Sequence, residues 1–321
     1  MNSRWSLGTK LTLFAVFAVL FAGMLIALSG RYQKSEAYDF TTENGKRDYD
    51  KEFTVNLNDN LYVDVDFGDV IIVGSSDNKV HVKVTMRGDE DYVERYPVEI
   101  EQEGNTVRVT QKQHSRHFHF FDGDNYDAKY EISVPKEFNL DLSTSGGNLN
   151  LSDVKGDIKG NTSGGDLDLS KLDGTITVST SGGNVYAREL TGTLDLETSG
   201  GDIVVESSSG VLKTETSGGN IKITDVDAEV RASTSGGNIR ARLQSNKGIR
   251  LSTSGGNITL ALPSTATGDV DADATGGNVS CDLPFQGKIK DDNMRGKING
   301  GGSEISLETS GGSIEIVERN Q

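Results

Sequence analysis

The sequence predicts an all-β fold: a single-stranded β-solenoid with about 18 residues per coil, preceded by one N-terminal transmembrane helix. A Ser/Thr-Gly-Gly-Asn/Asp motif recurs at a constant interval from Ser145 to Ser235, then at Ser254 and Thr275, with a last copy ending at Ser313. Apolar and polar residues alternate between the motifs, and an uncharged apolar run lies near the amino terminus. A fixed period of this length is typical of stacked coils that each contact only their neighbours.

Composition limits the classes of function. The 321 residues carry a net charge of −16, whereas nucleic-acid binding needs a basic surface, so we expect no nucleic-acid partner. Glycine accounts for 39 residues, but it clusters at the motifs rather than at every third position, which excludes collagen. The single cysteine, Cys281, excludes an intrachain disulfide and is expected to be a buried small apolar side chain. We expect no cofactor.

The amino terminus contains a membrane segment. Residues 11–28 form an apolar run without charge, close to the roughly 20 residues that a membrane-spanning helix needs. We therefore expect residues 1–10 in the cytoplasm, a single anchor at 11–28, a polar stalk at 29–50 and the rest of the chain outside the cytoplasm. Cleavage as a signal peptide stays open, because Ala27-Leu-Ser29 supplies a small-x-small site.

Residues 51–142 also predict β-structure, with less regular spacing. Apolar residues alternate over 61–65, 80–84, 98–100 and 107–109, and turn-forming residues separate these stretches. We expect this segment to begin the same sheet and to cap the open end of the solenoid.

A histidine-rich stretch interrupts this segment. His114, His117 and His119 lie close together and are followed by three carboxylates. Imidazole and carboxylate groups together suit zinc or another transition metal, but no second cluster completes a site. The alternatives are a solvent-exposed hairpin and a loop that contacts a partner, since aromatic residues flank the histidines.

The regular repeats occupy residues 143–317. Each repeat contains two alternating apolar stretches and two turns, one at the Gly pair and one half a period later, which predicts two strands and two corners per coil. The Gly-Gly corner requires either a positive φ or a close approach of backbone, both of which a Cβ would oppose. About nine coils stacked at about 4.8 Å make a rod about 40 Å long. We expect the coils to be right-handed.

Stacking places equivalent residues of successive coils in columns. In the corner column after the Gly pair, the two acids, Asp166 and Asp202, never occupy adjacent coils. Adjacent carboxylates would need a cation, so this pattern favours an Asn/Asp hydrogen-bond ladder over a calcium site. The neighbouring column is threonine, whose hydroxyls either stabilise the turns or form an ordered array that binds ice or a crystalline polymer. Its members are Thr144, Thr162, Thr180, Thr198, Thr216, Thr234 and Thr253.

One stretch of the repeats is basic. No Asp or Glu occurs between Val230 and Gly268, and the cations of this basic band are Arg231, Arg240, Arg242, Lys247 and Arg250. On an acidic rod such a band would bind an anionic glycopolymer or lipid headgroups. The alternative is ion pairing with acids of neighbouring coils, such as Asp225, Asp227 and Glu229.

The segments Gly68-Asp-Val-Ile-Ile-Val-Gly74 and Asn78-Lys-Val-His-Val-Lys-Val84, followed by the Thr-Ser-Gly-Gly-Asn/Asp ladder, resemble the bacterial adhesin-like β-strand-repeat proteins, also called toast-rack domains. The resemblance covers about residues 51–317 and implies a β-solenoid of unknown function without a catalytic motif. Some relatives sit beside membrane-stress sensing systems.

We therefore expect a non-enzymatic, membrane-anchored scaffold outside the cytoplasm that binds cell-envelope glycopolymers or a membrane protein partner. An extracytoplasmic sensory subunit of an envelope-stress system is the alternative, although a cytoplasmic part limited to residues 1–10 leaves little room for signal output. A polysaccharide-active enzyme would need clustered carboxylates or an Arg–Lys base in a groove, and the sequence contains no such constellation.

Overall fold

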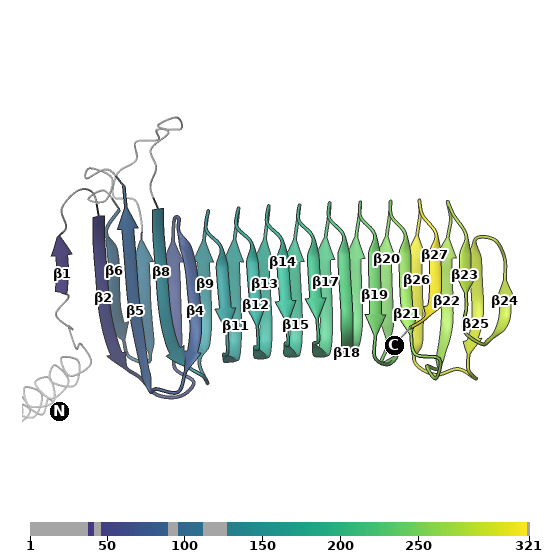
Figure 1. Ribbon diagram of the computed structural model, residues 1–321, viewed down its shortest axis with the longest axis horizontal. Coiled ribbons are helices and arrows are strands. Elements are labelled where there is room, and N and C mark those ends of the chain that lie inside the picture. The colour runs from purple at the N-terminus through teal and green to yellow at the C-terminus, as the bar shows by residue number, and fades with distance from the viewer. Residues whose placement is uncertain (1–37, 42–45, 89–95, 112–126, 320–321) are drawn as a thin grey trace, which may run out of the picture.

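The computed structural model describes residues 38–41, 46–88, 96–111 and 127–319, which form an elongated all-β rod (Figure 1). The apolar run at 11–28 and the histidine cluster at 114–119 lie outside the described residues. Among the residues that are described, no helix is long and apolar enough to cross a membrane.

The described strands form two sheets, which β18 (Ile221–Thr234) joins by running from one into the other. Along the rod, sheet A contains β1 (Tyr38–Thr41), β2 (Lys46–Thr54), β5 (Lys79–Arg87), β8 (Asp127–Pro135), β4 (Asp69–Ser75), β10 (Leu149–Ser152), β12 (Leu167–Ser170), β14 (Val185–Arg188), β16 (Ile203–Glu206), the start of β18, β19 (Ile239–Leu243), β21 (Ile258–Leu262), β27 (Ile314–Glu318) and β23 (Val279–Cys281). Sheet B contains β6 (Val98–Glu103), β7 (Thr106–Gln111), β3 (Asn60–Val65), β9 (Asn139–Thr144), β11 (Lys155–Thr162), β13 (Asp173–Thr180), β15 (Thr191–Thr198), β17 (Ser209–Thr216), the end of β18, β20 (Ile249–Thr253), β26 (Glu304–Thr309), β22 (Gly268–Ala274), β25 (Asn293–Ile298) and β24 (Phe285–Ile289).

Each regular coil contributes one short strand to sheet A and one longer strand to sheet B, and successive coils pair in parallel at an offset of one period. The apolar positions of the repeat face inward, as the alternation predicts. In one coil Leu167, Leu169, Leu172, Ile176 and Val178 are each at most 1% exposed. The core is a narrow column of Leu, Ile and Val side chains between the two sheets, which confirms the two-strand, two-corner coil.

The Gly-Gly corner depends on close backbone approach and not on positive φ. A Cβ on Gly201 would lie 2.0 Å from the carbonyl oxygen of Gly183 in the preceding coil. The buried threonine column uses the same contact. The Thr198 hydroxyl donates to Gly183 O at 2.8 Å and accepts the N–H of Gly201 at 3.3 Å. These hydroxyls therefore stabilise the turns and form no array at the surface.

The corner column is the Asn/Asp ladder that the sequence predicts. Asn184 N–H donates to Asp166 Oδ1 at 2.7 Å, and Asp202 N–H donates to Asn184 Oδ1 at 2.9 Å. The same contact recurs between neighbouring coils along the rod. Each side-chain oxygen thus satisfies a backbone N–H of the next coil, a role that requires no metal ion.

Positive φ angles occur at the second corner of the regular coils. The sequence left a positive φ open for the Gly pair, but the Gly pairs of the repeats do not adopt one. Asp153, Lys171, Glu189, Ser207 and Asp225 adopt φ between 50° and 59°. In four of these coils a glycine with positive φ follows three residues later, whereas the fifth has Ala228 there without a positive φ. The Ala228 coil is the one in which β18 continues from sheet A into sheet B without a break.

The coils do not follow sequence order at either end of the rod. Strands β3 and β4 lie between the coil of β7 and β8 and the coil of β9 and β10. At the other end β26 and β27 lie between β20–β21 and β22–β23. The last strand in the sequence, β27, consequently lies within the rod, while the antiparallel hairpin of β25 and β24 forms the far end (Figure 1). Ser313 therefore separates Asn257 from Asn278 in the corner ladder.

Candidate functional site

The five cations of the basic band lie on different sides of the rod. Arg231 and Arg250 are paired neighbours on the outer face of sheet B. Arg240 and Arg242 point outward from β19 in sheet A, and Lys247 lies at the corner between β19 and β20. The structure therefore brings Arg240 and Arg242 together and separates them from the other three.

Four of the five cations form ion pairs with acids of neighbouring residues or coils. Arg231 contacts Glu229 at 2.6 Å and Arg250 lies 3.6 Å from Glu304. Arg242 contacts Asp225 at 2.6 Å, and Lys247 contacts Asp227 at 2.8 Å. The hydrogen bond from Lys247 holds the pKa of Asp227 below its ordinary value. These acids include Asp225, Asp227 and Glu229, which the sequence suggests as ion-pair partners of the basic band.

Arg240 is the exception, and it has a cationic neighbour outside the basic band. Lys222 of β18 pairs in register with Arg240, both side chains are exposed, and neither forms an ion pair within the described part of the chain. We call Lys222 and Arg240 the cation pair. Like charges directly opposite each other on neighbouring strands repel, and an anionic group between them would relieve this repulsion.

The cation pair borders a shallow groove of about 280 Å³ on the outer face of sheet A. Its lining residues are Lys222, Ile223, Thr224, Arg240, Ala241, Arg242, Thr259 and Ala261. The hydroxyls of Thr224 and Thr259 supply neutral donors beside the two charges. Most of the groove surface is apolar, and the polar groups beside it are cations and hydroxyls without a carboxylate, so these groups suit the phosphate, sulfate or carboxylate groups of a ligand.

Lys222 lies outside the stretch without Asp or Glu that defines the basic band, but its position in the repeat indicates that it belongs with Arg240. Lys222 lies one full period before Arg240 and so occupies the same column one coil earlier. By the same rule Arg231, half a period before Arg240, falls on the opposite sheet. Coil phase, not proximity in sequence, determines which cations meet.

No group of three or more potential metal ligands occurs in the described ranges, and His114, His117 and His119 lie outside them. The fourth histidine, His81, is described, and its Nε2 lies 2.6 Å from Asp50 Oδ1 on the surface of sheet A. Cys281 is half-buried, and burial raises the pKa of its thiol.

Comparisons with solved structures return several bacterial proteins. A candidate lipid-binding protein from Parabacteroides distasonis ATCC 8503 is 17% identical, with 85% of this chain and 97% of that chain covered and a TM-score of 0.44. A candidate adhesin from Bacteroides fragilis NCTC 9343 is 15% identical, with 86% and 100% covered and a TM-score of 0.39. A candidate cell adhesion protein from Clostridium sporogenes ATCC 15579 is 13% identical, with 85% and 100% covered and a TM-score of 0.27.

No curated protein matches the sequence. The profile of one family, described as Toastrack DUF4097, matches residues 58–317, from just before β3 to the last strand, β27. This range includes the Gly-Gly corners, the coils that lie out of sequence order at both ends of the rod, and the cation pair. The chain belongs to the Toastrack DUF4097 family.

Proposed function

We propose that this protein is a membrane-anchored, extracytoplasmic binding module whose cation pair holds the anionic groups of a cell-envelope polymer. The proposal depends on one observation: Lys222 and Arg240 pair in register, and no acid neutralises them in the described structure. This is notable because acids outnumber cations in this chain by 48 to 32. Elsewhere in the basic band each cation has a carboxylate within 4.0 Å. An uncompensated pair costs stability, and a ligand that neutralises it explains its presence.

The surroundings of the cation pair favour a binding role over catalysis at this site. Backbone pairing between every pair of coils and the corner ladder make a stiff support that presents side chains at a fixed spacing. The groove at the cation pair contains no carboxylate or histidine that could transfer a proton. The apolar run at 11–28 would attach one end of this support to a membrane.

The test is binding of the full chain, purified in a non-ionic detergent, to soluble poly(glycerol phosphate). Reversing both charges, Lys222→Glu with Arg240→Glu, should weaken binding at least tenfold, and the affinity of the unaltered chain should fall with added salt. The matched control is Arg231→Glu with Arg250→Glu, which changes the net charge equally at two neighbouring cations of sheet B. Equal loss in both variants, or none in either, would overturn the proposal.

A second arm separates two sources of the same anionic chemistry. Vesicles of phosphatidylglycerol offer phosphate on a lipid surface, whereas poly(glycerol phosphate) offers it on a free chain. The proposal expects the cation pair to determine binding to the polymer. Dependence on the pair for vesicles alone would assign the site to lipid headgroups instead.

A further inference from the structure

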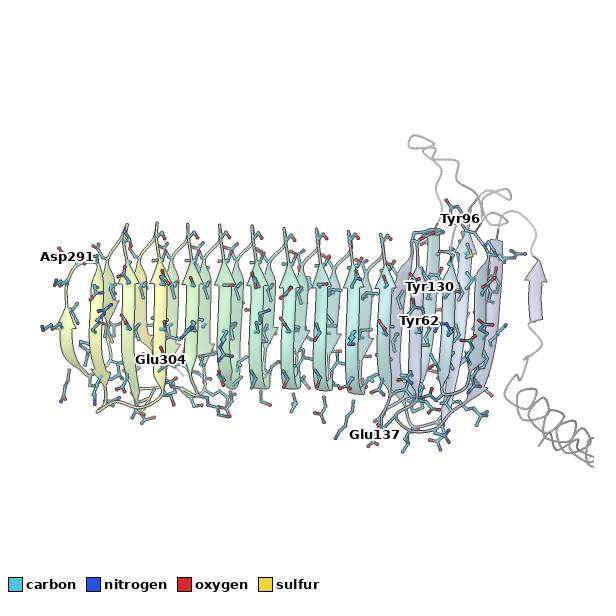
Figure 2. All side chains as sticks on the ribbon, turned by 180° about the vertical axis from the view of Figure 1, so that it is seen from behind. Tyr62, Tyr96, Tyr130, Glu137, Asp291 and Glu304 are labelled. Carbon is cyan, nitrogen blue, oxygen red and sulfur yellow. The ribbon has the colours of Figure 1, made fainter. Side chains whose placement is uncertain are left out.

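A second and larger groove lies on the other sheet, towards the N-terminal end of the rod. It has a volume of about 570 Å³ and crosses five neighbouring strands of sheet B, namely β7, β3, β9, β11 and β13. Figure 2 shows one of its residues, Tyr62, on this part of the rod. We call it the sheet B groove.

Two rows of outward side chains line the sheet B groove, with one residue of each row on each strand. The first row is Thr106, Asn60, Asn139, Asp157 and Thr175. The second row is Arg108, Tyr62, Asp141, Lys159 and Thr177. Every member of both rows carries a polar group, so the groove offers a continuous double line of hydrogen-bonding groups.

The charges of the sheet B groove cancel. Arg108 and Lys159 balance Asp141 and Asp157, whereas the whole chain has a net charge of −16. Lys159, Asp141 and Asp157 form no ion pair with any other described residue, and Arg108 approaches Glu103 only to 4.0 Å. Charged groups of both signs thus stay available to a ligand that donates and accepts hydrogen bonds but has no net charge.

Several of these side chains are held in place. The Arg108 guanidinium lies over the Tyr62 ring, 4.2 Å from its centre, and the Tyr62 hydroxyl lies 3.4 Å from Asp64 Oδ2. The Asn139 amide donates to Asn60 Oδ1 at 3.3 Å, and its oxygen accepts the N–H of Asp157 at 3.0 Å. Groups that are already ordered lose little entropy when a ligand binds.

The dimensions of the sheet B groove suit a polymer that lies along the rod. Five strands at about 4.8 Å spacing extend over about 19 Å, and each presents an equivalent pair of side chains. The Arg108 guanidinium covers one face of the Tyr62 ring, and the rest of this flat pair offers surface to C–H groups, while the rows beside it offer hydrogen bonds to hydroxyls. From this combination we propose that the sheet B groove binds an uncharged, hydroxyl-rich linear glycan.

This second site is independent of the cation pair. The sheet B groove has balanced charges and lies on sheet B, whereas the cation pair is uniformly positive and lies on sheet A. Each site therefore has its own ligand chemistry, and each is testable with the other intact.

The test is titration calorimetry of the full chain with cello-, chito-, laminari- and malto-hexaose. The detergent is a polyoxyethylene ether, because a sugar headgroup would compete. We expect at least one hexaose to bind and its affinity to fall at least tenfold in Tyr62→Ala and in Asp141→Ala with Lys159→Ala. The second variant alters only exposed side chains, so it separates loss of binding from loss of fold.

Two controls make the result specific. Tyr186→Ala removes a tyrosine that is 43% exposed on sheet A and should leave the affinity unchanged. Lys222→Glu with Arg240→Glu should also leave hexaose binding unchanged, so failure of one site does not imply failure of the other. No binding by any of the four hexaoses, or equal weakening in Tyr62→Ala and Tyr186→Ala, would overturn the proposal.

Discussion

Replacing the second glycine of a corner pair by alanine should destabilise the rod, whereas replacing the first should not. A Cβ at Gly201 would lie 2.0 Å from Gly183 O, 2.5 Å from its carbonyl carbon and 2.9 Å from Asn184 N. A Cβ at Gly200 would lie 3.5 Å or more from every neighbouring atom. Both glycines have φ outside the left-handed region, so the contrast tests contact between coils and not backbone conformation.

The expected loss of stability follows from how much too short the contact between the new Cβ and Gly183 O would be. An ordinary C···O contact is about 3.4 Å, so in Gly201→Ala the two coils must separate by about 1.4 Å at this corner. The separation also breaks the hydrogen bond from Thr198 to Gly183 O. Overpacking costs about 1–3 kcal/mol and a buried hydrogen bond about 1 kcal/mol, which together predict a loss of about 2–4 kcal/mol.

The assay is urea denaturation of the full chain in detergent, followed by circular dichroism, with Gly200→Ala as the matched control. We expect Gly200→Ala to lie within about 0.5 kcal/mol of the unaltered chain, or slightly above it, since alanine reduces the entropy of the unfolded state. Equal stability of the two variants would refute the reasoning, because it would mean that the corners do not determine the spacing of the coils.

Three further predictions follow from the same structure. Thr198→Val should cost about 1–3 kcal/mol in the same denaturation assay, because it leaves the buried carbonyl of Gly183 without its donor, whereas Thr193→Val on the exposed face should cost little. Lys213→Met should lower the free energy of unfolding by about 1 kcal/mol or less at pH 7, because the ion pair that Lys213 forms with Glu197 is partly exposed. The hydrogen bond to Glu197 raises the pKa of Lys213 from 10.5 to about 12, so that advantage is complete below pH 10.5 and disappears as the pH rises through about 12; a gap independent of pH would contradict this cause. Deleting residues 304–321 should expose residues 263–303 to limited proteolysis while 139–262 stay protected, because β26 and β27 join β20–β21 to β22–β23, and an unchanged cleavage pattern would contradict that arrangement.

The repeat made the cross-section of the coil predictable from sequence. Alternation placed Leu167 and Leu169 inside, the spacing of Asn184 and Asp202 predicted the hydrogen-bond ladder, and the glycine pair located one corner. These features depend on residues within one period or on the equivalent residue one period away. Local pattern is sufficient for them because every coil repeats the same environment.

The candidate sites were predictable only in part. The acid-free stretch led to Arg240 but also grouped it with Arg231, which lies on the other sheet beside Glu229. The partners of each cation depend on neighbouring coils, so composition along the chain could not separate a free cation from a neutralised one. To place Lys222 at the site one must follow the phase of the repeat, and to place Tyr62 one must know which coil lies beside its own.

The sequence by itself determined the length of the coil, its inward and outward positions and the chemistry of its corners. The tertiary structure decided the order of the coils along the rod. Similar coils offer similar edges, so periodicity does not specify which edges pair, and at both ends the chain places a coil between two others. That order sets Tyr62 of β3 beside Asp141 of β9 and so assembles the sheet B groove from segments that lie several periods apart in the sequence.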